Sequence, residues 1–280
     1  MWIYLSMFIS IFEHVLRGYR WNLLMDSSGK KLTTYITTNV MIVSYFFALF
    51  IPRFNDIARC YLISKTNNIK ISTSLGTVFS ERIFDLISLL ILSAIFILIE
   101  FDLFYGFIEN YVLSNIEFNT TTYLLIFGSL IVLFFILRYF SKKSSFISSN
   151  LNEFKLGVLT IKENYKNKGF LISTFLLWLI YFLMGYVIFF SFTETTDLGI
   201  NAGIAVLVAG SIGMIVPVNA GIGAYHFLVA SILLSYNLDY ESGLFFATLL
   251  HTSQIVCLAI LGIISSIILF FKIKSNNEYS

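Results

Sequence analysis

The chain has 280 residues, of which 58% are hydrophobic and 12% are charged, and its formal net charge is +2. A soluble domain carries about 25% charged residues, so this composition excludes an ordinary soluble globular protein and indicates an integral membrane protein. The two cysteines lie in separate apolar segments, which predicts neither a disulfide nor a cysteine metal site.

Apolar stretches of the length that enters a membrane alternate with polar connectors along the chain. These stretches cover residues 1–16, 32–52, 86–99, 118–137, 169–193, 198–238 and 242–271. The connector 138–168 has seven Lys or Arg residues against two acids, whereas the connector 100–122 has four acids and no Lys or Arg. By the positive-inside rule the first is cytoplasmic and the second external, which predicts about five full crossings, an external N-terminus and a cytoplasmic C-terminus.

Two segments, 35–64 and 198–238, must return to the face from which they enter if this topology holds. Their centres read "PRFND" and "PVNAGIGAY", and they contain the only two prolines of the chain, Pro52 and Pro217. We therefore predict an all-α polytopic membrane protein with two oppositely oriented broken or re-entrant hairpins in an inverted repeat. The alternative is two ordinary helix pairs joined by short loops.

We expect one integral membrane domain over residues 1–280. Its first half, 1–140, contains the hairpin 35–64, and its second half, 169–280, contains the hairpin 198–238. The basic cytoplasmic connector 141–168 joins the halves, and its lysines favour an amphipathic helix at an anionic membrane surface.

The first hairpin has charges beside its proline, at Arg53, Asp56 and Arg59. On a helix these three positions share one face. A guanidinium suits phosphate, and the abundant phosphate of a membrane is a lipid head group, so this face predicts a lipid-phosphate site. The alternative is simple anchoring of a helix end by arginine.

A second charged group, Glu81, Arg82 and Asp85, lies in "SERIFDL". One interpretation is a polar face turned toward the first hairpin, with Glu81 or Asp85 holding one of its arginines. The alternative is an interfacial anchor, in which Arg82 pairs with Asp85 or Glu81.

The second hairpin tip has different chemistry, because its glycines let backbone amides approach a ligand and the helix near Ala224 starts at the tip. The candidate residues there are Pro217, Asn219, Gly221, Gly223 and His226. His226 is either a titrating group or a hydrogen-bonded interior histidine. His251 and Gln254, in the last apolar stretch, are interpreted as polar contacts between helices.

The segments "PRFNDIARCYL", "SERIFDL" and "PVNAGIGAYHF", in this order and spacing, resemble the transmembrane region of the lysylphosphatidylglycerol synthase family, a flippase-like membrane domain. The matching positions are Pro52, Arg53, Arg59, Glu81, Arg82, Asp85, Pro217, Gly221 and Gly223. Asn55 and Asp56 stand where the family usually has Gly and Glu, and Ala220 replaces a glycine. His226 stands at the usual acid, so the family's proton or cation role is not carried over to it.

The resemblance implies translocation of lipid between leaflets, and not aminoacylation, because the soluble synthase domain does not accompany these motifs. We expect a translocator of a bacterial-type cytoplasmic membrane that recognises a phosphate-bearing lipid or lipid-linked intermediate for envelope biogenesis. No cofactor, metal, catalytic residue or nucleic acid is expected; the expected partners are membrane lipids, anionic or lipid-linked, and an envelope-synthesis enzyme. The alternatives are a membrane enzyme acting on a lipid or polyprenyl head group, with Asp56, Glu81 or Asp85 as base, and a non-catalytic subunit of an envelope-synthesis complex.

Overall fold

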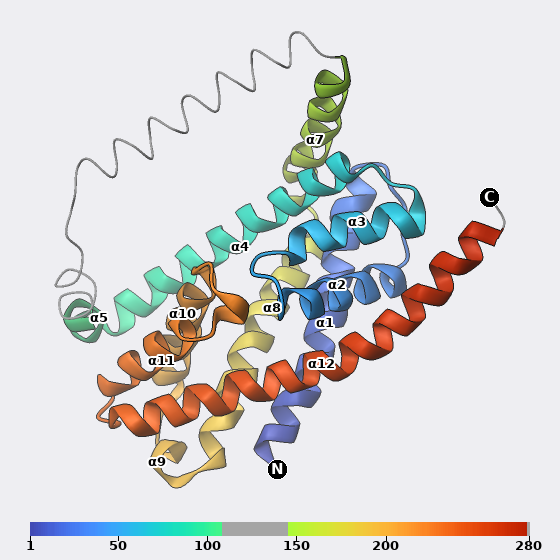
Figure 1. The fold of residues 1–280 in the computed structure, drawn as a ribbon. Helices are drawn as coiled ribbons and strands as arrows, with labels where there is room; N and C mark the ends of the chain where they lie inside the picture. Colours follow the sequence, from blue (N-terminus) through green and yellow to red (C-terminus); the bar gives the residue numbers. More distant parts are fainter. Residues whose placement is uncertain (108–144, 279–280) are drawn as a thin grey trace, which may run out of the picture.

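The computed structural model describes residues 1–107 and 145–278, and the described part is helical without strands (Figure 1). Before the gap the helices are α1 (Trp2–Ser27), α2 (Thr34–Ala48), α3 (Asn55–Asn67), α4 (Ile71–Ile99) and α5 (Phe101–Phe107). After it come α7 (Ser145–Asn164), α8 (Lys168–Tyr186), η2 (Val187–Ser191), α9 (Thr193–Thr196), α10 (Ile200–Ile215), η3 (Asn219–Gly221), α11 (Ala224–Leu234) and α12 (Tyr240–Glu278). The all-α prediction is confirmed, whereas the crossing expected over 118–137 lies outside the described residues.

Three of the described segments are long and apolar enough to cross a membrane: Ile71–Ile99, Lys168–Ser191 and Tyr240–Ser275. Large apolar side chains on these helices, such as Leu98, Phe175 and Phe270, are exposed on the surface of the chain. A soluble monomer rarely exposes contiguous apolar surface of this extent, whereas lipid covers it at no cost. These helices therefore identify an integral membrane protein.

The chain folds into two helical hairpins at the predicted places. The first pairs α2 with α3 around a turn at residues 49–54, and the second pairs α10 with α11 around a tip at residues 216–223. Gly221 and Gly223 adopt φ values of +77° and +88°, which only glycine adopts without strain. Both hairpins contact α4 and α12, so they lie between these two long helices (Figure 1). Their orientation across a membrane and the inverted repeat stay predictions.

Two helices extend further than the hydropathy pattern predicts. The first apolar stretch was expected to end at residue 16, but α1 continues to Ser27 and includes Arg17 and Arg20. Similarly, the apolar stretch at 86–99 belongs to α4, which begins fifteen residues earlier, at Ile71. The polar residues in these extensions contact other helices: the Trp21 indole donates to the Thr77 hydroxyl at 3.1 Å, for example. When helices satisfy each other's polar groups, a hydropathy analysis does not recognise the polar residues as part of those helices.

The basic connector contains a helix, α7, which packs along the first half of α4. Gly76 and Gly157 allow the two backbones to touch, because a Cβ at Gly157 would lie only 2.7 Å from the Gly76 Cα. Beyond this crossing, Glu153 accepts hydrogen bonds of 2.7 Å from both Lys70 and Thr73. These two donors hold the pKa of Glu153 below its usual value. These contacts make the packing of α7 on α4 specific. Contact of α7 with the membrane surface stays a prediction.

We expect Gly157→Ala to lower the thermal stability of the protein in detergent. Alanine favours a helix over glycine by about 1 kcal/mol, but overpacking costs about 1–3 kcal/mol and the obstacle here is rigid backbone. The measurement is the melting temperature of the purified protein. Gly199→Ala is the control, since a Cβ at Gly199 meets no atom within 4 Å. Equal melting temperatures for the two variants would contradict the close α4–α7 crossing.

Candidate functional site

Helices α1, α3 and α4 bring six charged side chains together in a closed ring of alternating sign. Each arginine contacts the next carboxylate within 3.5 Å, and each carboxylate contacts the next arginine. We call this set the charge ring; in order it consists of Arg20, Glu81, Arg59, Asp56, Arg82 and Asp85. Its three positive and three negative charges balance.

One half of the charge ring is sealed inside the protein. Glu81 bridges two helices, because its Oε1 lies 3.0 Å from Arg20 Nη2 and its Oε2 lies 2.6 Å from Arg59 Nη1. The three side chains are at most 1% exposed. Aromatic rings cover the arginines, with Arg59 over Trp21 at 5.2 Å and Arg20 over Phe170 at 5.9 Å. Isolated charges in such surroundings are very costly, so each depends on its partners.

The other half of the charge ring is partly exposed. Asp56 Oδ1 lies 3.0 Å from Arg59 Nη2 and 2.7 Å from Arg82 Nη2, and the side chains of Asp56 and Arg82 are 32% and 38% exposed. Asp85 lies 2.6 Å from Arg20 Nη2 and 3.5 Å from Arg82 Nη1. The ring thus connects the buried centre of the protein to the surface of a cavity.

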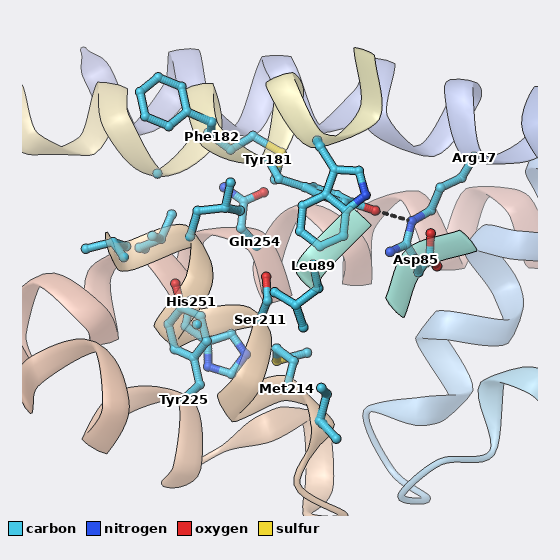
Figure 2. A pocket seen from close by; sticks show the side chains of 18 of the residues that line it. Arg17, Asp85, Leu89, Tyr181, Phe182, Ser211, Met214, Tyr225, His251 and Gln254 are labelled. Atoms are coloured by element: carbon cyan, nitrogen blue, oxygen red, sulfur yellow. Dashed lines mark hydrogen bonds between the residues drawn. The ribbon is translucent and has the colours of Figure 1, made fainter. Parts of the chain in front are cut away.

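That surface belongs to two adjoining cavities of about 500 and 340 Å³, which share several lining residues. The larger lies between α4, α8, α10 and α12, and Figure 2 shows part of its wall. Three arginines and two aspartates line it: Arg17, Arg53, Arg82, Asp56 and Asp85. Much of the remaining wall is apolar, and includes Leu86, Leu89, Val206, Leu207 and Ile215.

Arg17 has its own acidic partner beside the charge ring. Its Nε lies 2.7 Å from Glu13 Oε1 and 2.7 Å from the Tyr181 hydroxyl, and Figure 2 shows the second contact. The ring of Tyr45 also lies 4.7 Å from this guanidinium. Arg17 is therefore a held cation with little freedom to move.

Arg53 differs from these arginines, since it has no carboxylate within 4 Å among the described residues. It lies in the turn of the first hairpin with a φ of +59°, in the left-handed region that non-glycine residues seldom occupy. Its Nη2 donates to the carbonyl of Met214 at 3.1 Å, which joins the turn to the end of α10. The tips of the two hairpins therefore meet at an arginine whose charge is uncompensated.

The predicted residues of the first tip and of α4 divide into two groups. Arg53, Asp56 and Arg82 line both cavities and Asp85 lines the larger one, whereas Arg59 and Glu81 lie behind the wall. Glu81 contacts Arg59, as the first interpretation expects, and Arg82 lies 3.5 Å from Asp85, as the alternative expects. Because Arg59 is only 1% exposed, it is placed to position its neighbours in the charge ring.

The second tip lines the smaller cavity mostly with residues other than those predicted: Val216, Val218 and Ala220. Gly221 lines the smaller cavity, whereas Pro217, Asn219, Gly223 and His226 line neither cavity. His226 Nδ1 accepts from the Gly223 backbone N–H at 3.3 Å, a contact at the N-terminus of α11. Its interpretation as a hydrogen-bonded histidine is thereby favoured.

Sequence reasoning missed several lining residues of the larger cavity, including Arg17, Trp178 and Tyr181. It interpreted His251 and Gln254, which also line this cavity, as contacts between helices, and the hydrogen bond from Gln254 to the Ser6 hydroxyl on α1 confirms this for Gln254.

A signal existed for Arg17. Glu13, Arg17 and Arg20 are spaced by four and three residues, so they share one face if the first helix continues through them. Polar residues on one face inside a membrane helix predict a buried network or a cavity. Nothing in the sequence marks Tyr181 or Trp178 among 49 aromatic residues.

Comparison with known proteins identifies a family and a relative. Residues 1–262 match the model of the family described as "Lysylphosphatidylglycerol synthase TM region". A protein of Methanocaldococcus jannaschii named UPF0104 membrane protein MJ1078 is 31% identical over 204 residues, which cover 71% of this chain and 82% of that protein. No solved structure matches.

We expect Glu81→Gln to destabilise the protein strongly. The substitution removes the charge that two buried arginines share, and breaking a buried pair in this way costs about 3–5 kcal/mol. The measurement is the melting temperature in detergent. Glu153→Gln is the matched control, because it breaks an ion pair in which Lys70 is 60% exposed, and such pairs contribute little. If both variants melt like the wild type, the charge ring is not the structural centre described above.

Proposed function

Because the chain belongs to the family of lysylphosphatidylglycerol synthase transmembrane regions, we propose that it is a flippase-like translocator of a phosphate-bearing lipid or lipid-linked intermediate. The observation that carries this proposal is Arg53, an uncompensated cation at the meeting point of two hairpin tips. The proposal includes a cytoplasmic membrane of the bacterial type and a substrate used in envelope synthesis.

The charges of the larger cavity favour an anion. On its wall Arg82 is paired with Asp56 and Asp85, and Arg17 is paired with Glu13, so Arg53 is the cation without a carboxylate within 4 Å among the described residues. Arg53 can turn its guanidinium from the Met214 carbonyl to a phosphate, since a charged acceptor makes the stronger hydrogen bond. Arg82, which is 38% exposed, lines the same cavity and is the second candidate ligand.

The wall chemistry favours an amphiphile over a free anion. Leucine, valine and isoleucine side chains of α4 and α10 form much of the lining next to the charged residues. The cavity of about 500 Å³ is within the usual range for a small-molecule site. A lipid satisfies both kinds of wall if its head group lies at the arginines and the first part of its acyl chains lies along α10.

Movement between leaflets requires the hairpin tips to separate. The hydrogen bond from Arg53 to Met214 ties them, and such a bond contributes about 1 kcal/mol. In many transporters broken helices form the site, and access changes when one repeat moves against the other around it. We propose that binding of a phosphate at Arg53 breaks this tie and couples recognition to opening.

We expect Arg53→Gln to lose an anionic lipid that co-purifies with the wild-type protein in mild detergent. Glutamine keeps a donor but removes the charge, so enrichment of that lipid should fall at least about tenfold, as for the loss of a charge-assisted hydrogen bond. The measurement is mass spectrometry of extracted lipids. Lys272→Gln is the control, an exposed basic residue outside both cavities. Arg59→Ala is unsuitable, because it removes a buried member of the charge ring.

Exchange of a labelled anionic lipid between the leaflets of reconstituted vesicles separates this proposal from its alternatives. The proposal expects exchange with the wild type and a marked reduction with Arg53→Gln. Covalent change of the lipid would favour the membrane enzyme, although each of its candidate bases, Asp56, Glu81 and Asp85, is held by two arginines. Neither activity, together with a stably co-purifying synthase, would favour the non-catalytic subunit.

A further inference from the structure

The smaller cavity has a titratable cluster on its wall that takes no part in the proposed contact with phosphate. Its side chains come from α1, α2 and α8, and we call it the histidine cluster: Glu13, His14, Arg17, Tyr45 and Tyr181. Arg53 lines the same cavity of about 340 Å³. The histidine cluster and the uncompensated arginine of the first hairpin therefore face one space.

Glu13 is the centre of the histidine cluster, and its two oxygens face different nitrogens. Its Oε1 lies 2.7 Å from Arg17 Nε, and the Tyr181 hydroxyl donates to the same oxygen at 3.3 Å. Its Oε2 lies 2.8 Å from His14 Nδ1. The side chains of Glu13 and His14 are only 7% and 12% exposed. Ionisable groups buried in a membrane protein are costly, and they are typical of proton and ion pathways.

Protonation of His14 changes the charge balance of this cavity. With His14 neutral, Glu13 and Arg17 cancel, and Arg53 is the uncompensated cation among the described residues of the wall. Because an ionised carboxylate has no hydrogen to donate, Nδ1 keeps its proton beside Glu13, and Nε2 is the nitrogen that gains or loses one. When Nε2 gains a proton, Glu13 must balance both His14 and Arg17, so one further positive charge faces the cavity.

We propose that His14 is a proton-binding site coupled to anion binding, so that the protein takes up a proton together with its anionic lipid. This inference rests on the proposed function, because the anion is the phosphate at Arg53, and it adds a coupling ion to the proposed translocation. The coupling is reciprocal: the protonated imidazole favours the anion, and the anion favours the protonated imidazole by the same factor. For two unit charges on the wall of so small a cavity, that factor is about tenfold in affinity.

Other titratable and charged groups face His14 across the cavity, and they suit this role less well. Outside the helix of His14 these groups are Tyr45 on α2, Tyr181 on α8, Arg53 in the hairpin turn, Asp56 on α3, Arg82 on α4 and His251 on α12. Phenols and guanidinium groups do not ordinarily titrate between about pH 5 and 8, and Asp56 is held by two arginines. The remaining group, His251, has no carboxylate within 4 Å among the described residues, whereas His14 has Glu13.

The test measures the affinity of phosphatidylglycerol for the purified protein in detergent between about pH 5.5 and 8. The phosphodiester of this lipid keeps one negative charge throughout this range. The charge of His14 is present at the lower pH and is lost as the pH rises through the range in which histidine titrates, so we expect about tenfold tighter binding at the lower pH. Binding near the middle of the range should also take up protons from a weakly buffered solution. Equal affinities at both ends of the range overturn the inference without any variant.

Two variants of His14 have opposite expected results. His14→Gln removes the proton site and should bind at every pH with the lower, high-pH affinity of the wild type. His14→Arg fixes the positive charge and should bind at every pH with the higher, low-pH affinity. His251→Gln is the matched control, because it removes the other histidine of the same cavity and should keep the pH dependence. A pH dependence that survives in His14→Gln, or that is lost in His251→Gln, overturns the inference.

The Arg53→Gln variant separates failure of this inference from failure of the proposed function. It should weaken binding of phosphatidylglycerol at both ends of the pH range. If it weakens binding at neither end while the wild type shows a pH dependence that His14→Gln removes, the phosphate site is wrong and the proton site stands. If it weakens binding at both ends and the wild type shows no pH dependence, the phosphate site stands and the proton site is wrong.

Discussion

The contact of Glu81 with two arginines is the interaction on which the rest of this structure depends. Through Arg20 and Arg59 it joins α1 and α3 to α4, in surroundings where none of the three charges could exist alone. The alternation then continues through partly exposed members to the cavity, so that the ring is neutral as a whole. The charge ring is neutral without Arg53, so it fixes the first hairpin without a contact to that residue.

The position of Arg53 follows from this arrangement. Asp56, the acid closest to it in sequence, is occupied by Arg59 and Arg82, so the arginine at the turn keeps an uncompensated charge and reaches only a backbone carbonyl of the other hairpin. A left-handed residue at this turn is locally unfavourable, and such strain is typical of sites where function outweighs local stability. The same residue thus ties the two tips and offers the cavity its most available cation.

The two hairpin turns were more predictable from the sequence than the contacts between helices. Pro52 and Pro217 mark both hairpin turns because proline ends a helix whatever surrounds it, which is a local effect. The charges on α4 share a face for an equally local reason. In contrast, Arg20 was assigned to a connector, because hydropathy assumes that an arginine contacts water or head groups, and its actual partners lie 61 and 65 residues away. The contacts of Tyr181 with α1 likewise arise from tertiary packing.

We propose that a lipid phosphate binds where the two hairpin tips meet. The most direct measurement is an experimental structure of the protein in nanodiscs that contain an anionic phospholipid, with the distance from the Arg53 guanidinium to the nearest phosphate as the readout. We predict a phosphate within hydrogen-bonding distance of Arg53 and acyl-chain density along α10. A cavity without lipid density, with Arg53 still on the Met214 carbonyl and lipids only around the outer helices, would contradict it.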